Sequence, residues 1–126
     1  MYQYRTVIVD DKWLIRTELK YMLSKYPSIK VIGEAETAAE AFELISETKP
    51  DVVFLDIQMP DFSGFDLLKK LNYKFKVIFI SAYKQYMEES KKYHPVDFLL
   101  KPINVRKLST TIQKLQETMA PEGKGA

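Results

Sequence analysis

Three carboxylates stand directly after apolar runs of the sequence, where their chemistry and spacing suit metal binding. Asp10 and Asp11 follow the run at residues 6–9, and Asp56 follows the run at residues 52–55. If the two runs are adjacent strands of a parallel sheet, the three side chains meet at one edge of that sheet. Clustered negative charges repel one another at low dielectric, and a bound divalent cation relieves that repulsion. Because all the ligand atoms are oxygens, the cluster favours Mg²⁺ over a soft metal.

Two further polar residues follow apolar runs in the same way. Ser81 comes after the run at residues 77–80, and Lys101-Pro102 ends the run at residues 98–100. A hydroxyl and an ammonium beside metal-loaded carboxylates suit a phosphoryl group, because they stabilise the charge on its equatorial oxygens. The chain has no cysteine and one histidine, His94, which we expect to be exposed in a loop. A strand-end aspartate can then act as the nucleophile by forming an aspartyl phosphate.

The alternation of short apolar runs with longer amphipathic stretches predicts the elements that position these residues. The strand-like runs lie at residues 6–9, 30–34, 52–55, 77–80 and 98–100. Apolar side chains recur at helical spacing over residues 15–26, 38–45, 65–71 and 105–119, with a weaker pattern over residues 84–92. Three of the runs are continuous rather than alternating, which indicates strands buried on both faces.

Five strand–helix repeats predict an α/β fold, a single flavodoxin-like, doubly wound (βα)5 domain with helices on both faces of a five-stranded parallel sheet. Right-handed crossovers favour the strand order 2-1-3-4-5, which reverses where the three carboxylates stand. Thr37 with Glu40 predicts a capping box for the second helix, and Asn104 a cap for the last one. We expect the domain to span residues 1–119 and residues 120–126 to form a flexible tail or the start of a linker.

Length and composition narrow the functional classes. With 126 residues, 46% of them hydrophobic and 29% charged, the chain has the balance of one globular domain rather than of a disordered segment. A net charge of +2 is too weak to indicate nucleic acid or an anionic membrane as a direct partner. The lack of cysteine excludes disulfides and cysteine-ligated metals. Neither a signal-peptide pattern nor a membrane-spanning stretch is present in the sequence, so we expect a cytoplasmic protein.

Four motifs, each at the end of a predicted strand, make the sequence resemble a receiver domain of bacterial two-component response regulators. They lie at residues 7–11, 52–60 with 63–65, 80–83 and 97–102. The resemblance covers residues 5–118. The amino-acid sequences of the last three motifs are most similar to those of receivers joined to LytTR-type (LytR/AlgR-type) DNA-binding domains.

The resemblance implies a role for each residue of the site. Asp56 matches the phosphoacceptor. Asp10 and Asp11 match the acidic pair that holds Mg²⁺, together with Asp56 and the backbone carbonyl of Gln58. Lys101 matches the lysine that pairs with the phosphoryl group.

The resemblance also implies a switch and two structural features. Ser81 matches the switch hydroxyl, which bonds a phosphoryl oxygen, and Phe98 matches the switch aromatic, whose rotamer follows that hydroxyl. The Lys101–Pro102 peptide bond is expected to be cis, in line with the rule that cis bonds precede proline. Gly64 is expected to have a structural role.

Lys12 departs from the family pattern, because the residue after the acidic pair is usually acidic. An ammonium there could pair with the carboxylates and partly compete with Mg²⁺. Phe98 stands where tyrosine is commoner, which removes a hydroxyl but keeps the aromatic ring. Lys12, Arg16, Lys20 and Lys25 give the first helix a basic side, which we interpret as a solvated face or, alternatively, as a docking surface for an acidic partner.

The implied function is that of a phospho-accepting signalling domain, not a turnover enzyme. A sensor histidine kinase would supply the phosphoryl group to Asp56, and the surface of the fourth helix, fifth strand and fifth helix would change in response. The output would be transcription through a LytTR-type domain absent from this chain, so DNA would be reached only through that domain. A homodimer formed on phosphorylation is also implied, and no membrane partner is expected.

Three alternatives stay open at this point. A pseudo-receiver, an interaction module that never takes phosphate, is disfavoured by the complete set of site residues. A Mg²⁺-dependent phosphatase of the haloacid-dehalogenase type needs a second aspartate two residues after the nucleophile, where this chain has Gln58. A flavodoxin-like binding protein needs a loop rich in Ser, Thr and Gly after the first strand, where this chain has Asp10-Asp11-Lys12.

Overall fold

A computed structural model of the chain describes residues 2–118. The strands are β1 (Tyr4–Val9), β2 (Ile29–Ala35), β3 (Val52–Asp56), β4 (Lys76–Ser81) and β5 (Asp97–Leu100). The helices are α1 (Trp13–Leu23), α2 (Ala38–Thr48), α3 (Gly64–Lys70), α4 (Met87–Ser90) and α5 (Val105–Thr118). The expected tail at residues 120–126 lies outside the described residues, as does Met119 at the end of the last apolar pattern.

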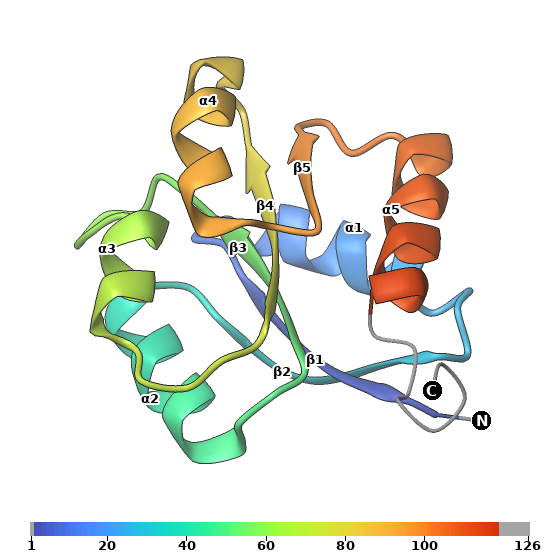
Figure 1. The fold of residues 1–126 in the computed structure, drawn as a ribbon, viewed down its shortest axis with the longest axis horizontal. Coiled ribbons are helices and arrows are strands. Elements are labelled where there is room, and N and C mark those ends of the chain that lie inside the picture. The colour runs from blue at the N-terminus through green and yellow to red at the C-terminus, as the bar shows by residue number, and fades with distance from the viewer. Residues whose placement is uncertain (1, 119–126) are drawn as a thin grey trace.

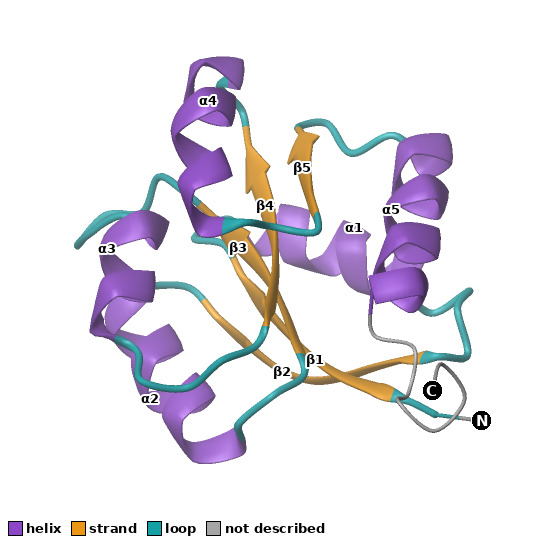
Figure 2. Cartoon of the chain, in the orientation of Figure 1, coloured by secondary structure: helices purple, strands orange, loops and turns teal. Residues whose placement is uncertain are grey.

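The five strands form one parallel sheet in the order β2-β1-β3-β4-β5, which confirms the predicted topology (Figures 1 and 2). Helices α1 and α5 cover one face of the sheet, and α2, α3 and α4 cover the other. The continuous apolar runs explain this arrangement, because β3 and most of β4 are buried on both faces.

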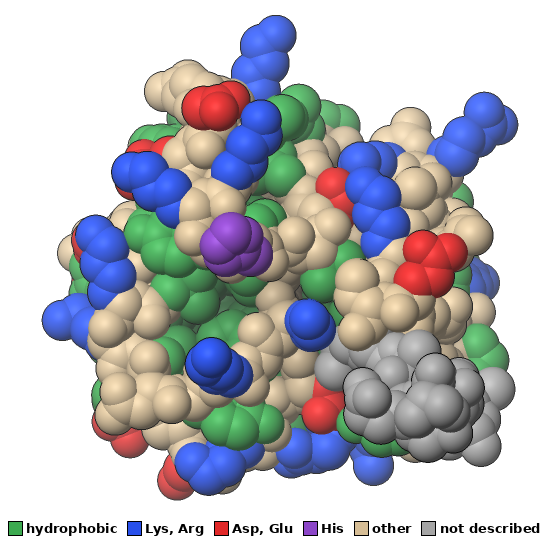
Figure 3. Space-filling view, viewed as in Figure 1, with side chains coloured by type: hydrophobic (Ala, Val, Ile, Leu, Met, Phe, Trp, Pro, Cys, Tyr) green, Lys and Arg blue, Asp and Glu red, His purple; other side chains and the backbone are tan. Residues whose placement is uncertain are grey.

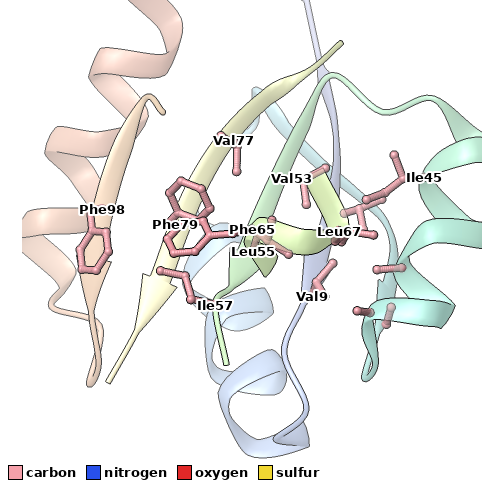
Figure 4. Packing of buried hydrophobic residues seen from close by; sticks show 14 residues of the cluster. Val9, Ile45, Val53, Leu55, Ile57, Phe65, Leu67, Val77, Phe79 and Phe98 are labelled. Atoms are coloured by element: carbon pink, nitrogen blue, oxygen red, sulfur yellow. The ribbon is translucent and has the colours of Figure 1, made fainter. Parts of the chain in front are cut away.

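Alternate residues of each central strand point into two separate hydrophobic cores, one on each face of the sheet. Val53 and Leu55 of β3 pack with α2 and α3, together with Phe79 and Phe65, as Figure 4 shows. Phe54 lies between these two residues in the sequence, and it packs on the other face against α1 and α5. Each fully buried large side chain contributes about 1.5–3 kcal/mol through removal from water, so the strand ends that carry the polar residues are held by rigid elements.

Two helices differ from the sequence-based expectation. The weak pattern over residues 84–92 is not one helix but a 3₁₀ turn (Lys84–Tyr86), the four-residue α4 and a second 3₁₀ turn (Lys91–Tyr93). In α5 the buried stripe begins at Leu108, whereas Val105 is 71% exposed and borders a groove between α1 and α5.

Helix caps link the site loops to the scaffold. The amide of Lys107 donates to Asn104 Oδ1, which confirms that cap. Thr37 accepts from the amide of Glu40, but the Glu40 carboxylate accepts from the amide of residue 36, one position before the expected partner. Asp61, in the loop after β3, accepts from two amides at the start of α2 and so ties that loop to the helix.

The basic side chains on the face seen in Figure 3 are scattered rather than gathered in one patch, in line with the small net charge. His94 is exposed in the loop between Tyr93 and β5, as expected. Among the described helices, none has the length and hydropathy that a membrane crossing needs.

Candidate functional site

The carboxylates of Asp10, Asp11 and Asp56 meet at the carboxyl ends of β1 and β3. Each of the three offers an oxygen within 4.8 Å of the others. Asp10 is fully buried and Asp56 is only 3% exposed. The site lies where the strand order reverses, which is where open α/β sheets bind ligands. The sequence placed these three residues together correctly.

Lys101 brings a positive charge from the end of β5 into the carboxylate cluster. Its Nζ lies 2.6 Å from Asp10 Oδ2 and 3.5 Å from Asp56 Oδ2. The backbone supports this approach, because the amide of Lys101 donates to the carbonyl of Ser81. The Lys101–Pro102 peptide bond is cis, as the resemblance implies. One buried ammonium among three carboxylates leaves an excess of negative charge.

That excess affects the pKa of Asp56. Burial, together with the nearby Asp10 and Asp11 carboxylates, raises this pKa to about 7, although Lys101 acts in the opposite direction. The ionised form is therefore disfavoured in this environment, and an added cation would restore it.

One buried oxygen gives a test of whether a metal ion fits. Among residues 2–118, no donor reaches Asp10 Oδ2 at a hydrogen-bonding angle, since the Lys101 contact is an ion pair of poor directionality. Lys101 balances part of the charge on this oxygen, but a lone pair stays without a directed hydrogen bond. A hard divalent cation beside carboxylate oxygens satisfies it, so the residues fit Mg²⁺.

The cluster opens into a small cavity of about 120 Å³. It is lined by Asp11, Lys12, Ile15, Asp56, Gln58, Ala82, Tyr83 and Lys101. Ligand pockets for drug-sized molecules are several times larger, about 300–1,000 Å³. The cavity therefore suits a small anion with a metal ion and not a nucleotide or flavin.

Ser81 and Phe98 are both buried and do not line the cavity. The Ser81 hydroxyl accepts from the amide of Tyr83 at 2.9 Å and donates to the carbonyl of the same residue at 3.2 Å. Phe98 is 8% exposed and packs in the core on the α2, α3 and α4 side. Ser81 thus ends β4 directly before the cavity residue Ala82, with its hydroxyl engaged by backbone, whereas Phe98 is a core residue.

The backbone around Gly64 leaves no room for a side chain. The amide of Gly64 donates to the carbonyl of Ile57, which brings the start of α3 against the end of β3. A Cβ at Gly64 would lie 2.5 Å from the backbone oxygen of Asp56 and 3.1 Å from Leu55 Cγ. The glycine is therefore required for close approach to Asp56, since its backbone φ is not positive.

Lys12 contributes to the cluster through both its backbone and its side chain. The amide donates to Asp10 Oδ1 at 2.9 Å, and the exposed ammonium lies 3.5 Å from Asp11 Oδ2. The side chain thus pairs with one carboxylate of the cluster, as its sequence position suggests.

The sequence analysis missed the contacts that two residues, Arg16 and Gln58, make at the site. Arg16, interpreted as part of a solvated or docking face, is instead 12% exposed and bonds both Glu34 and the carbonyl of Asp10. Gln58 Nε2 donates to the hydroxyl of Tyr86 at 3.0 Å, which joins the loop after β3 to the turn before α4. The only sequence signal for the contact between Arg16 and Glu34 is that an acidic residue stands near the end of β2.

Comparisons with known proteins identify relatives of the whole domain. The family model described as "Response regulator receiver domain" matches residues 6–113. Sensory transduction protein LytT of Enterococcus faecalis is 40% identical over 116 residues, which cover 90% of this chain and 48% of LytT. Transcriptional regulatory protein BtsR of Salmonella typhimurium is 35% identical over 115 residues, covering 90% of this chain and 48% of BtsR.

The fold comparison points the same way. The REC domain of AraT, a response regulator from Geobacillus stearothermophilus, superposes with a TM-score of 0.83 at 29% identity, covering 98% of both chains. The present chain spans about half the length of the curated relatives it matches.

Proposed function

The chain belongs to the response regulator receiver domain family of two-component systems, and on that premise we propose that Asp56 is its phosphoacceptor. The observation that carries this proposal is the set of contacts around Asp56. Two further carboxylates lie within metal-binding reach, and one ammonium lies 3.5 Å away, at the mouth of a cavity of phosphoryl size. A surface aspartate would have none of these partners.

The proposed reaction is phosphoryl transfer from a phosphohistidine of a sensor kinase. A carboxylate oxygen of Asp56 attacks phosphorus, the new O–P bond forms as the P–N bond breaks, and the electron pair returns to the imidazole nitrogen. Lys101 favours the ionised nucleophile and pairs with the phosphoryl oxygens. Asp10, Asp11, Asp56 and the carbonyl of Gln58 would hold Mg²⁺, which when bound supplies positive charge against those oxygens.

The proposed response begins at Ser81. On phosphorylation its hydroxyl leaves the carbonyl of Tyr83 and donates to a phosphoryl oxygen, and Phe98 changes rotamer with it. The register supports this coupling, because Ser81 pairs with Leu100 and Phe79 pairs with Phe98 across β4 and β5. Phosphorylation would thus bias two states of the surface made by α4, β5 and α5.

The proposed output is transcription through a LytTR-type DNA-binding domain beyond this chain. The similarity to LytT and BtsR and the half-length coverage of both relatives support this assignment. In the same proposal, the α4–β5–α5 surface forms a homodimer on phosphorylation, and the protein acts in the cytoplasm.

Intact-protein mass after incubation with acetyl phosphate tests the proposal. We expect a gain of one phosphoryl group that requires Mg²⁺ and is lost in Asp56→Asn. The matched control is Asp66→Asn, which removes an exposed carboxylate from α3 and should leave the gain unchanged.

The other outcomes separate the alternatives. No gain under any condition supports a pseudo-receiver. A gain that persists in Asp56→Asn means that another residue accepts the phosphoryl group. Continuous release of phosphate from small phosphate esters would support the phosphatase.

A further inference from the structure

Arg16 is the one cation of the basic side of α1 that the structure buries against the site. Its Nε lies 2.6 Å from Glu34 Oε1, and its Nη1 donates to the carbonyl of Asp10 at 2.7 Å. The side chain is only 12% exposed. A planar guanidinium can serve both acceptors at once, because its donors have a fixed fork geometry.

The hydrogen bond from Arg16 is one of three that hold Asp10 in place. Its amide donates to the carbonyl of Ala35, its carbonyl accepts from Arg16, and its Oδ1 accepts from the amide of Lys12. Only Oδ2 lacks a directed hydrogen bond from residues 2–118, and it faces the cluster and Lys101. Three fixed atoms therefore leave the fourth aimed at the place where the cation would sit.

Glu34 holds Arg16 in this position. It projects from β2 and also receives the ammonium of Lys20 at 2.5 Å. The hydrogen bond from Lys20 is the largest cause that lowers the pKa of Glu34, with Arg16 acting in the same direction against burial. Both cations share the Glu34 carboxylate, but only Arg16 also reaches Asp10, through a direct hydrogen bond to its backbone carbonyl.

We propose that Arg16 is a positioning residue for metal binding, which orients Asp10 through its backbone carbonyl while Glu34 anchors the guanidinium. This inference rests on the proposed function of the carboxylate cluster as a Mg²⁺ site. Residues that orient metal ligands typically change metal affinity by about 10–100-fold when they are removed. Since Arg16 acts on a carbonyl, we expect the lower end of that range.

Lys20 offers a matched control. It lies on the same helix, carries the same charge and shares the Glu34 carboxylate, but its ammonium contacts Glu34 and not Asp10. A general effect of charge or helix docking would appear in Lys20→Gln and Arg16→Gln alike. A positioning effect would appear in Arg16→Gln alone.

The experiment is a Mg²⁺ titration by isothermal calorimetry, paired with urea unfolding of each variant in EDTA. We expect Arg16→Gln to weaken Mg²⁺ binding about tenfold and Lys20→Gln to change it less than about twofold. Arg16→Lys should restore part of the affinity, because a lysine reaches one acceptor but lacks the fork. Glu34→Gln should weaken Mg²⁺ binding less than Arg16→Gln does. The double variant with both substitutions should bind Mg²⁺ about as weakly as Arg16→Gln alone.

Each contrary result has a distinct meaning. Unchanged Mg²⁺ affinity in Arg16→Gln, or equal losses in Arg16→Gln and Lys20→Gln, overturns the positioning role. If Arg16→Gln does not fold, wild-type affinity in Arg16→Lys and Glu34→Gln together overturns it. If the wild-type protein binds no Mg²⁺ at millimolar concentration, the proposed metal site itself fails, and this inference with it.

Discussion

Lys101 lies closer to Asp10 than to Asp56, the proposed phosphoacceptor, with Nζ distances of 2.6 Å and 3.5 Å. The lysine therefore pairs first with the fully buried carboxylate and only second with the nucleophile. It acts as the internal counter-ion of the whole cluster when no metal is bound. This arrangement leads to a stability prediction as well as a functional one.

Lys101→Met should lower the free energy of unfolding in EDTA by about 2–3 kcal/mol at pH 8, because it leaves buried carboxylates uncompensated. The loss should shrink at pH 5, where Asp56 takes up a proton instead. Urea unfolding at both values measures this. The control is Lys91→Met, which breaks an exposed pair with Glu88 and should cost under about 0.5 kcal/mol. Equal effects of the two variants at pH 8 would contradict the counter-ion role.

Asp56 gives a pH dependence with a definite sign. Its folded pKa of about 7 lies above its ordinary value of 3.8, so the native state binds more protons than the unfolded state between those values. Ionised Asp56 therefore destabilises the metal-free protein as pH rises through this window. Asp56→Asn removes this destabilising charge. Its free energy of unfolding should exceed that of the wild type by about 2–4 kcal/mol above pH 7, and the two should be equal near pH 3.

Thermal or urea unfolding of both proteins across pH 3–8 in EDTA tests the Asp56 prediction. Saturating Mg²⁺ should reduce the advantage of Asp56→Asn, since the cation favours the carboxylate. A wild-type protein that gains stability relative to the variant as pH rises would show that Asp56 has a depressed pKa instead.

Lys12 should weaken Mg²⁺ binding, because its ammonium pairs with Asp11 Oδ2. Exposed pairs contribute up to about 1 kcal/mol, so Lys12→Ala should tighten Mg²⁺ binding about two- to fivefold. Calorimetric titration measures the change. Lys25→Ala removes the same charge from an exposed position near the end of α1, where Lys25 contacts Tyr21, and should have little effect. Similar gains in both variants would assign the change to net charge.

Gly64→Ala should damage the site without touching a charged residue. The added Cβ would meet the backbone oxygen of Asp56 at 2.5 Å, so α3 or the end of β3 must shift. Such overpacking costs about 1–3 kcal/mol, and acetyl phosphate labelling of Asp56 should fall as well. In Gly33→Ala the new Cβ meets only the end of the Leu44 side chain, at 3.1 Å. That variant should lose less stability and keep its labelling.

The sheet order and the convergence of Asp10, Asp56 and Lys101 were predictable, because each polar residue directly follows a buried run and parallel strands share one carboxyl edge. These signals are local in the sequence. The role of Arg16 was not predictable in this way, since its partner Glu34 is on another element and its burial depends on how α1 packs on β2.

The turns around α4 were mispredicted for a related reason. Tyr86 and Tyr93 do not form a helical stripe of their own but pack against Phe65 of α3, with ring centroids 6.2 Å and 5.0 Å away. Tertiary contact across the sheet face thus fixes two short 3₁₀ turns on either side of α4, where sequence periodicity suggested one weak helix.

Asp97 ties β5 to α5 within the proposed output surface. Its Oδ2 accepts from Thr111 Oγ1 at 2.7 Å and its Oδ1 from the amide of Phe98 at 2.9 Å, and two lysines lie within 3.3 Å. Although burial opposes it, these hydrogen bonds lower the pKa of Asp97. The native state thus binds fewer protons at this group than the unfolded state, and its stabilisation is present above the unfolded pKa, near 4.

Asp97→Asn should therefore cost about 1–3 kcal/mol at pH 7, and the cost should disappear as pH falls below 4 through the folded pKa. Urea unfolding of wild type and variant between pH 2.5 and 7 measures it. Thr111→Val, which removes one donor but keeps the carboxylate and both lysines, should cost less and reduce the pH dependence only in part. A constant difference between wild type and Asp97→Asn over this range would mean that Asp97 stabilises β5 and α5 by shape rather than by charge. Because Phe98 follows Asp97 directly, the loss should also loosen the strand that carries the proposed switch.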